Sequence, residues 1–221
     1  MELELSPHNA RILDSLLKTE TIIIKISENI IIQELSDSKS LLIQITLFPL
    51  FFTEYLQNDL NFSFSFSTPK FFKKGMKSLR IVITDLIISL SWKFNTYNYY
   101  KEIYISSTEL YSLDFNEIKS INLDLVLLFE IIKYLKSDVI VLKFLENYFI
   151  ISGENKSEKA VVYMENNFNE ILKFPQKNIK TILELMTDTD ECMLSIDELK
   201  KTACFISKFP EYLLSIFTAL L

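Results

Sequence analysis

Glycine and histidine are almost absent from this sequence. Its 221 residues include two glycines, Gly75 and Gly153, and a single histidine, His8. A dinucleotide-binding turn or a phosphate-binding loop needs several glycines close together, so neither can be built here. His8 would have to serve any Ser-His-Asp or Cys-His arrangement, but the surrounding "SPHNA" is typical of a helix start. We therefore expect no catalytic residues and no enzymatic activity.

Cysteine is also scarce. Cys192 and Cys204 are the two cysteines, and their spacing matches no metal-binding motif, so we expect two buried thiols. The acidic stretch "TDTDE", residues 187–191, is expected to be a solvated loop rather than a magnesium site. The sequence thus predicts neither a metal nor a cofactor.

Long hydrophobic runs are missing as well, although hydrophobic residues make up 49% of the chain and charged residues 24%. The longest uncharged run, residues 40–53, is shorter than the roughly 20 residues that span a bilayer, and it contains Pro49. The first residues, "MELELSPHNA", lack the basic and apolar regions of a secretory signal. We expect an intracellular globular protein with no membrane partner.

The hydrophobic pattern predicts the same order of elements in both halves: strand, helix, strands, helix, strands. In the first half we expect helices at residues 9–19 and 69–79 and strands at 2–5, 21–27, 30–36, 41–47, 61–67, 80–84, 87–94 and 99–106. In the second half we expect helices at 125–136 and 176–186 and strands at 119–123, 139–145, 148–152, 160–165, 191–196, 201–207 and 212–220.

An internal duplication supports this parallel. "LKTETIIIKISENIII" at residues 17–32 aligns without gaps with "LKSDVIVLKFLENYFI" at residues 135–150, with seven identical positions of sixteen. In each copy a helix is expected to end before a strand, and Glu-Asn is expected to form a hairpin turn in which Asn takes a left-handed backbone. The offset suits a duplicated domain. We expect domains at residues 1–106 and 120–221, joined by a connector at 107–119.

A strongly basic segment stands out in this acidic chain. "PKFFKKGMKSLR", residues 69–80, has five positive charges and no negative one, whereas the whole chain has a formal net charge of −6. Thr68 before Pro69 is a helix-start signature. On a helix, the cations would form one stripe and the apolar residues would face a sheet. The other predicted helices also carry lysines, so positive charge is concentrated on the helices.

Two such domains resemble the sliding-clamp superfamily typified by proliferating cell nuclear antigen (PCNA). The likeness covers essentially the whole chain but rests on topology, because the family has no short diagnostic motif. Within it, "LLKTETIIIKISENIIIQELSD", "FFTEY", "NFSFSFSTPKFFKKGMKSL" and the ending "YLLSIFTALL" are most similar to the Hus-one subunit of the nine-one-one DNA-damage checkpoint clamp. The chain departs from the family in its short loops and in the abbreviated segment at residues 166–175.

The resemblance implies an α+β fold of two clamp domains, each with antiparallel sheets and two helices lining the inner face of a three-subunit ring around duplex DNA. Basic helix faces would contact phosphates without reading sequence. The residues expected to face DNA are Arg11, Lys18, Lys70, Lys73, Lys74, Lys77, Arg80, Lys133, Lys136, Lys173, Lys177 and Lys180.

The resemblance also implies partners. Subunits would pair through edge strands that contain Lys101, Ile103, Ile105, Ala160, Val162 and Met164. A groove beside the connector, at Leu110, Tyr111 and Leu113, would bind repair or checkpoint factors. The implied assembly is a nuclear heterotrimer with two other clamp subunits, loaded by a clamp loader. A homotrimeric replication clamp, and a scaffold that keeps the fold without binding DNA, remain open.

Overall fold

The computed structural model describes residues 1–36, 38–56, 62–113, 115–155, 157–186, 189, 191–199 and 201–221. The chain forms two compact units. The first consists of Met1–Asp37, Ile43–Ser112 and Phe209–Leu214, and the second of Ser38–Leu42, Leu113–Lys208 and Ser215–Leu221. Each unit thus includes a short segment from the other half of the sequence. The expected domain boundaries at 106 and 120 stay a prediction.

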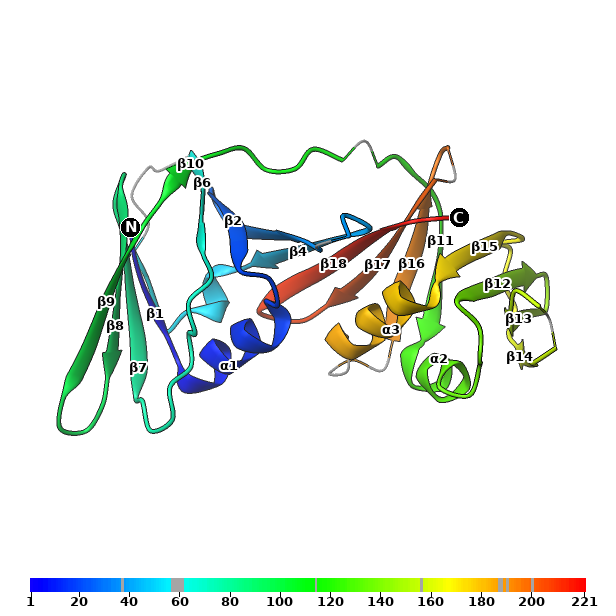
Figure 1. Cartoon of the computed structure of the whole chain (residues 1–221), viewed down its shortest axis with the longest axis horizontal. Coiled ribbons are helices and arrows are strands. Elements are labelled where there is room, and N and C mark those ends of the chain that lie inside the picture. Colours follow the sequence, from blue (N-terminus) through cyan, green and yellow to red (C-terminus); the bar gives the residue numbers. More distant parts are fainter. Residues whose placement is uncertain are drawn as a thin grey trace. The chain divides into compact units, whose positions relative to one another are not determined.

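The first unit contains two antiparallel sheets and the helix α1 (Figure 1). One sheet has the order β5-β1-β7-β8-β9, with β5 (Glu54–Leu56), β1 (Glu2–Leu5), β7 (Ser78–Ile83), β8 (Ile87–Lys93) and β9 (Asn98–Tyr104). The other has the order β10-β6-β2-β3-β4, with β10 (Ser106–Ser107), β6 (Phe62–Ser67), β2 (Thr21–Ile26), β3 (Ile30–Leu35) and β4 (Leu41–Leu47). The helices are α1 (Pro7–Leu16) and the 3₁₀ turn η1 (Pro49–Phe51).

The core of the first unit follows the two-residue period of its strands. In β6, "FSFSFS", Phe64 and Phe66 are buried while the intervening serines are less so. The helix α1 begins at Ser6, whose side chain accepts the backbone N–H of Asn9 at 3.1 Å. The buried side chain of Asn9 donates in turn to the backbone oxygen of Phe51 at 2.6 Å. This bond ties α1 to η1.

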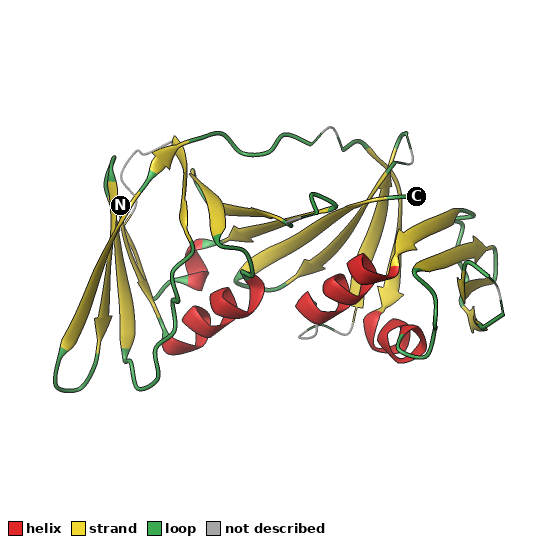
Figure 2. Cartoon of the chain, viewed as in Figure 1, coloured by secondary structure: helices red, strands yellow, loops and turns green. Residues whose placement is uncertain are grey.

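The second unit also has two sheets, with two helices, α2 (Leu125–Ile132) and α3 (Gln176–Leu185) (Figure 2). One sheet has the order β14-β13-β12-β15, with β14 (Lys159–Tyr163), β13 (Tyr148–Gly153), β12 (Val139–Leu145) and β15 (Ile171–Pro175). The other has the order β18-β17-β16-β11, with β18 (Tyr212–Ala219), β17 (Thr202–Lys208), β16 (Glu191–Asp197) and β11 (Glu117–Asp124). The helix α2 contacts β11 and β16, and α3 contacts β12 and β15.

Most strand predictions are confirmed. Those at residues 2–5, 41–47 and 139–145 match β1, β4 and β12 at both ends. The strands β5 and β15 were not predicted from the sequence. In β15, Leu172 and Phe174 are buried while Ile171 is 59% exposed, so a two-residue period was present in a segment that we interpreted as a shortened loop.

The duplicated segments both form hairpins, β2–β3 and β12–β13, but their registers differ by one residue. Lys25 pairs with Ile31, whereas Lys143 pairs with Ile150. Three residues therefore turn the first hairpin and two turn the second. The expected left-handed asparagine is wrong: among the described non-glycine residues, positive φ occurs at Lys39 and Asn169, not at Asn29 or Asn147.

The predicted helix at residues 69–79 is wrong. Residues 68–77, which we call the basic loop, run irregularly from β6 to β7, so the first unit has one α-helix rather than two among its described residues. A helix of this length containing Gly75 is weak by itself. Contacts from α1 and β8, described below, hold the segment in another conformation.

The unexpected strand β15 gives a stability test. We expect Phe174→Ala to lower the free energy of unfolding by about 3–5 kcal/mol, because this fully buried ring contacts Phe205 at a centroid distance of 5.7 Å. The exposed Ile171 on the same strand is the matched control, and Ile171→Ala should change stability by less than about 0.5 kcal/mol. Urea unfolding measures both. Equal effects would contradict the assigned register of β15.

Candidate nucleic-acid interface

The basic loop is held by hydrogen bonds to α1 and β8. The carboxylate of Asp14 on α1 accepts the backbone N–H of Phe71 at 2.7 Å and that of Phe72 at 3.1 Å. The indole N–H of Trp92 on β8 donates to the backbone oxygen of Phe71 at 2.7 Å, and both of these side chains are buried. Two regular elements therefore fix a segment that has no regular structure of its own.

The loop reverses direction at Gly75, where φ is +83°. This left-handed conformation favours glycine, because a side chain would be strained there. The N–H of Met76 donates to the backbone oxygen of Lys73 at 3.1 Å and closes the turn, and the Met76 side chain is buried. As a result Lys74 and Lys77 are exposed at the tip of the loop.

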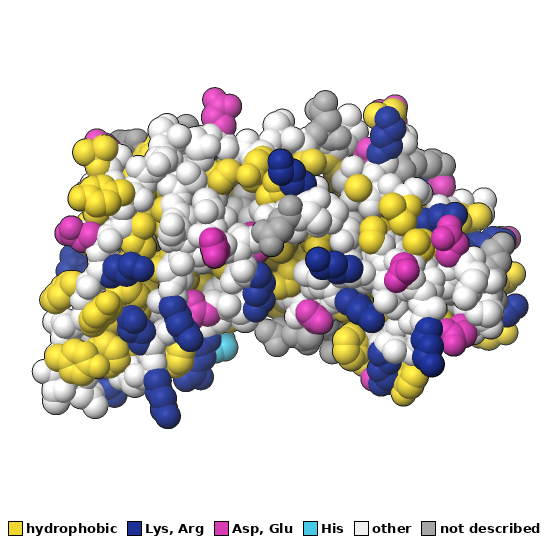
Figure 3. All heavy atoms as spheres, in the orientation of Figure 1, with side chains coloured by type: hydrophobic (Ala, Val, Ile, Leu, Met, Phe, Trp, Pro, Cys, Tyr) yellow, Lys and Arg dark blue, Asp and Glu magenta, His cyan; other side chains and the backbone are white. Residues whose placement is uncertain are grey.

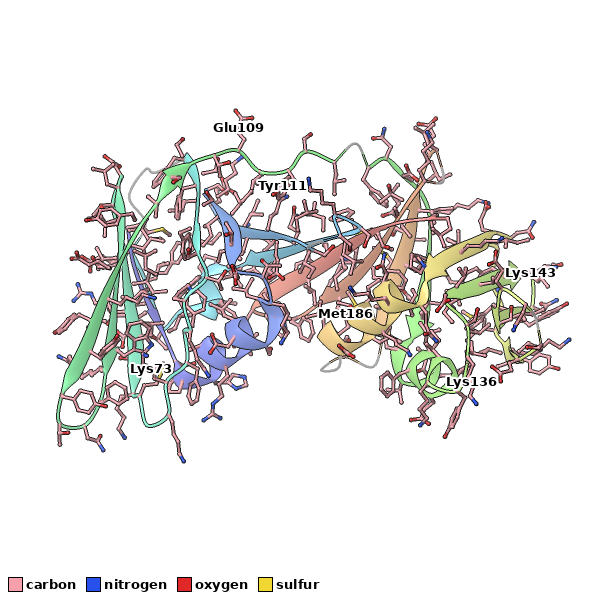
Figure 4. The ribbon with its side chains drawn as sticks, viewed as in Figure 1. Lys73, Glu109, Tyr111, Lys136, Lys143 and Met186 are labelled. Carbon is pink, nitrogen blue, oxygen red and sulfur yellow. The ribbon has the colours of Figure 1, made fainter. Side chains whose placement is uncertain are left out.

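Aromatic rings position two of the cations. The ammonium of Lys73 lies 4.6 Å from the ring centroid of Tyr99 and 4.8 Å from that of Trp92. The guanidinium of Arg11 on α1 lies 4.2 Å from the ring centroid of Phe72. Such cation–π contacts are favourable and leave the charge in place. The charge of Lys73, labelled in Figure 4, is therefore held against the end of the sheet that contains β8 and β9.

The remaining cations of this surface are exposed, and the acidic residues nearest to them in sequence are Asp14 on α1 and the exposed Glu20. Lys18 follows α1, and Lys70 lies near the start of the basic loop. Residues 60–84 and 86–101 contain no aspartate or glutamate. In the space-filling view, lysine and arginine side chains gather over α1 and the basic loop (Figure 3). The first unit thus carries a mainly positive surface, with the half-buried Asp14 among the cations.

Arg80 does not share this surface. Arg80 lies on β7 between the buried Leu79 and Ile81. Since side chains alternate along a strand, Arg80 points away from the core, on the face of the sheet opposite to those two residues. There it forms an ion pair with Glu2, and this hydrogen bond and charge raise the pKa of Arg80. Its expected place in one stripe with Lys70 to Lys77 depended on the helix that is not formed.

The lysines around α2 are partly matched by acids. Lys133 follows α2, where it forms an ion pair with Glu130, and that hydrogen bond raises the pKa of Lys133. Its ammonium also lies 5.0 Å from the ring centroid of the exposed Tyr134. Lys136, labelled in Figure 4, is exposed, and its backbone N–H donates to Glu158 at 2.9 Å. Charge in this region is mixed.

The lysines near α3 also lie beside acidic residues. Lys173 on β15 forms an ion pair with Glu154 at 3.2 Å. Lys177 and Lys180 are exposed on α3 and line an open groove whose other lining residues include Asp138 and Glu184. The second unit therefore brings its predicted lysines to α2, β15 and α3, but not as a surface of one sign.

The predicted pairing strands lie at the edges of their sheets. The strand β9 ends the order β5-β1-β7-β8-β9, and β14 ends the order β14-β13-β12-β15. Tyr104 on β9 is 80% exposed and Tyr163 on β14 is 84% exposed. Of the expected interface residues, Lys101 is exposed, Ile103 is buried, and Ile105, Ala160, Val162 and Met164 are half-buried. An edge strand has unpaired backbone groups that another chain can use.

The connector is fixed at Tyr111 by Gln33 on β3. The Gln33 side chain accepts the backbone N–H of Tyr111 at 2.7 Å and donates to its backbone oxygen at 3.3 Å. The side chains of Tyr111 and Leu113 are 44% and 42% exposed, and Leu110 is half-buried. The predicted partner residues therefore line an exposed stretch that Gln33 holds at Tyr111. Figure 4 labels Tyr111 and Glu109 on it.

Chemically reactive groups are rare in the described part of the chain. Cys192 and Cys204 are buried, and burial raises the pKa of Cys192 to about 12, so its thiol stays protonated at neutral pH. No group of three or more potential metal ligands occurs among the described residues. Thr187, Asp188 and Asp190 of the acidic stretch lie outside those residues. None of the described helices is long and apolar enough to span a membrane.

Comparison with known proteins identifies the fold. No family model and no curated protein matches the sequence. Among solved structures, the chain is similar to one in the crystal structure of the PCNA2-PCNA3 complex from Sulfolobus tokodaii, with 14% identity and a TM-score of 0.74. The match covers 100% of this chain and 99% of the other. This chain therefore has the PCNA-like sliding-clamp fold over its full length, as the sequence predicted.

The two hydrogen bonds that backbone amides donate to Asp14 can be tested directly. In the Asp14→Ala variant we expect faster hydrogen exchange at the amides of Phe71 and Phe72, because each loses its acceptor. The adjacent, exposed Ser15 is the control, and Ser15→Ala should leave those amides unchanged. Unchanged exchange in Asp14→Ala would show that other contacts determine the loop conformation.

Proposed function

We propose that this protein is a subunit of a DNA sliding clamp. The proposal is carried by the surface of the first unit, where α1 and the basic loop present cations with no acidic residue in residues 60–84 or 86–101. A positive surface in an acidic chain suits a partner with a regular negative charge. The clamp fold gives this surface a role, since the similar archaeal chain is part of a complex of two PCNA proteins.

The proposed mechanism is physical rather than chemical. Lysines neutralise phosphates and release condensed counterions, which attracts any sequence and weakens with salt. Contacts to phosphates alone do not fix a register, so an enclosing ring can move along the duplex. Retention then comes from enclosure and not from tight binding. No cofactor and no catalytic residue is required.

The residues proposed to face DNA fall into two groups. In the first unit they are Arg11, Lys18, Lys70, Lys73, Lys74 and Lys77. In the second unit they are Lys133, Lys136, Lys173, Lys177 and Lys180. The first group contributes more of the attraction to phosphates, because ion pairs with Glu130 and Glu154 offset two charges of the second group. Arg80 is left out, since it pairs with Glu2 on the other face of its sheet.

Ring closure is proposed to use β9 of one subunit and β14 of the next. Both are edge strands, and antiparallel pairing would satisfy their unpaired backbone groups. Between Lys159 and Glu165, β14 and the residues after it carry no charge, so this edge is poorly protected against association. A heterologous contact of this kind forms a ring when its rotation closes.

We propose a nuclear checkpoint clamp as the finer assignment, on the likeness to the Hus-one subunit noted above. The chain would then assemble with two different clamp subunits, be placed on DNA by a clamp loader, and tether repair or checkpoint proteins at Leu110, Tyr111 and Leu113. A homotrimeric replication clamp is the competing assignment. Because one chain does not identify its partners, the composition of the assembly separates the two.

A scaffold without DNA binding is the second candidate function. Apolar side chains on α2 favour it, because Val126 is 55% exposed and Phe129 is 45% exposed. These side chains contribute no charge on a helix that the clamp proposal turns toward DNA. A scaffold would use that surface to bind a protein instead.

Charge reversal of the basic loop tests the DNA-binding proposal. We expect the triple variant Lys73→Glu, Lys74→Glu and Lys77→Glu to lose retention on closed circular duplex DNA, because three attractions become repulsions that oppose enclosure of the duplex by the ring. Lys74 and Lys77 are exposed, whereas Lys73 is half-buried against two rings, so thermal unfolding of the variant is compared with that of the unaltered protein and should be cooperative in both. The measurement is the amount of protein that stays on the circle after loading, compared with DNA that has been linearised.

A second triple variant controls for the change in net charge. Lys39, Lys201 and Lys208 are exposed and lie outside the proposed surface, so reversing them alters the total charge equally. We expect retention to persist in this control. Equal loss in both variants, or full retention in the first, would contradict the assignment of the basic loop to DNA.

The native mass tests the proposed ring. We expect the protein isolated from its own cells to be part of an assembly of three clamp-sized chains, whereas the single chain has a mass of 25.9 kDa. Val162→Glu on β14 should reduce the assembly to single chains, and Val126→Glu on α2 should not. Two different co-purifying clamp chains would support the checkpoint assignment and a self-trimer the replication one. A monomer in the unaltered protein would favour the scaffold.

A further inference from the structure

The turn between β8 and β9 carries a pair of stacked aromatic rings. The rings of Phe94 and Tyr97 lie 4.5 Å apart at an angle of 11°, and the N–H of Phe94 donates to the backbone oxygen of Tyr97 at 2.9 Å. The second ring is 58% exposed although it stacks on the first. A flat aromatic surface is therefore preformed and open to solvent.

A second aromatic pair lies next to it on the same sheet. Trp92 and Tyr99 are cross-strand partners, with ring centroids 5.4 Å apart. Since positions two apart share a face of a strand, Phe94 continues the row of Trp92 and Tyr97 continues that of Tyr99. The ammonium of Lys73 already contacts the Trp92 and Tyr99 rings. The four rings thus form a continuous aromatic surface, with Lys73 at the Trp92 and Tyr99 end and the exposed ring of Tyr97 at the other.

Further cations surround this turn. The backbone N–H of Lys77 donates to the backbone oxygen of Lys93 at 2.7 Å, which fixes the tip of the basic loop beside the end of β8. The side chains of Lys74 and Lys77 are exposed. The side chain of Lys93 is exposed on the opposite face of the sheet, in a groove that Glu4 and Glu102 also line. No acidic residue occurs from position 86 to 101, so the segment that carries the rings contributes positive charge alone. The combination is a stacking surface with phosphate-binding groups beside it.

We infer that this turn binds single-stranded nucleic acid by stacking an unpaired base on Tyr97. Bases paired inside a duplex cannot stack on an aromatic side chain, whereas the unstacked bases of a single strand can. Lys74 and Lys77 bind the phosphates on either side of the stacked base. A protein partner fits less well, because residues 86–101 carry lysines and no acidic residue that could pair with the cations of a protein surface. The site does not require ring closure and goes beyond the proposed sliding on duplex DNA.

Three single-residue variants test the stacking. Labelled oligothymidylate, oligouridylate and a linear duplex of the same length serve as probes, with binding followed by fluorescence anisotropy. We expect Tyr97→Ala to weaken binding of the single strands by at least about fivefold, the lower end for loss of one stacked base. Tyr97→Phe keeps the ring and should bind as the unaltered protein does. Duplex binding should be the same in all of them.

Tyr134 provides the matched control. It is 70% exposed and also lies beside a lysine, Lys133, but in the second unit and without a stacked ring behind it. Tyr134→Ala should leave single-strand affinity unchanged. The inference is overturned if the unaltered protein does not bind single strands, if Tyr97→Ala binds them as well as the unaltered protein does, or if Tyr134→Ala causes an equal loss.

The test separates this site from the clamp proposal. Tyr97→Ala retains all the lysines, so it should still be retained on closed circular duplex DNA. Failure of the clamp proposal would appear as no retention in the unaltered protein, with single-strand binding intact. Failure of the stacking site would appear as normal retention with no effect of Tyr97→Ala on single strands. Trp92, the only tryptophan, gives a second readout, since its emission should change when a strand binds near Lys73.

Discussion

The carboxylate of Asp14 is the contact on which the basic surface depends. Its two oxygens accept consecutive backbone N–H groups of the basic loop, which lie 57 and 58 residues further along the chain. In a helix those N–H groups would find partners within the segment, and in an irregular loop they need another acceptor. A negative group therefore lies among cations and binds the backbone beneath them. The lysines of the loop can remain charged and exposed because the loop is fixed through its backbone.

This contact also explains which part of the structure the sequence could predict. Strands such as β1, β4 and β12 follow from a two-residue or continuous apolar pattern within a few residues. The basic loop and the start of β7 have apolar residues at positions 71, 72, 76 and 79, which is also the spacing of a helix face. Partners distant in sequence, Asp14 and Trp92, select the irregular conformation, and no local pattern contains them. Tertiary contacts override a weak helical preference, and the predicted place of Arg80 was lost with the helix.

The two units share a hairpin pattern but differ in electrostatics. In the second unit, Lys133 and Lys173 each lie beside a glutamate, and Asp138 and Glu184 line the groove of Lys177 and Lys180. Exposed ion pairs add little stability, but each one reduces the field that a phosphate would meet. The sequence could place these lysines on the elements around α2 and α3. It could also place Glu130 and Glu184, which lie on the same helices as these lysines or directly before them. It could not place Glu154 and Asp138, which come from other segments of the chain.

The strand β9 combines two features that would be liabilities in an isolated chain. It is an edge strand, and Tyr99 and Tyr100 on it are 45% and 67% exposed. Bare aromatic edges invite association with other chains, and Lys101 and Glu102 in the middle of the strand are the kind of charged residues that limit it. Under the proposed ring, the backbone edge would be covered by the next subunit while the turn at Tyr97 would stay at the end of the strand. Edge and turn can then serve different partners, because the first offers backbone groups along the strand and the second offers a ring face beyond it.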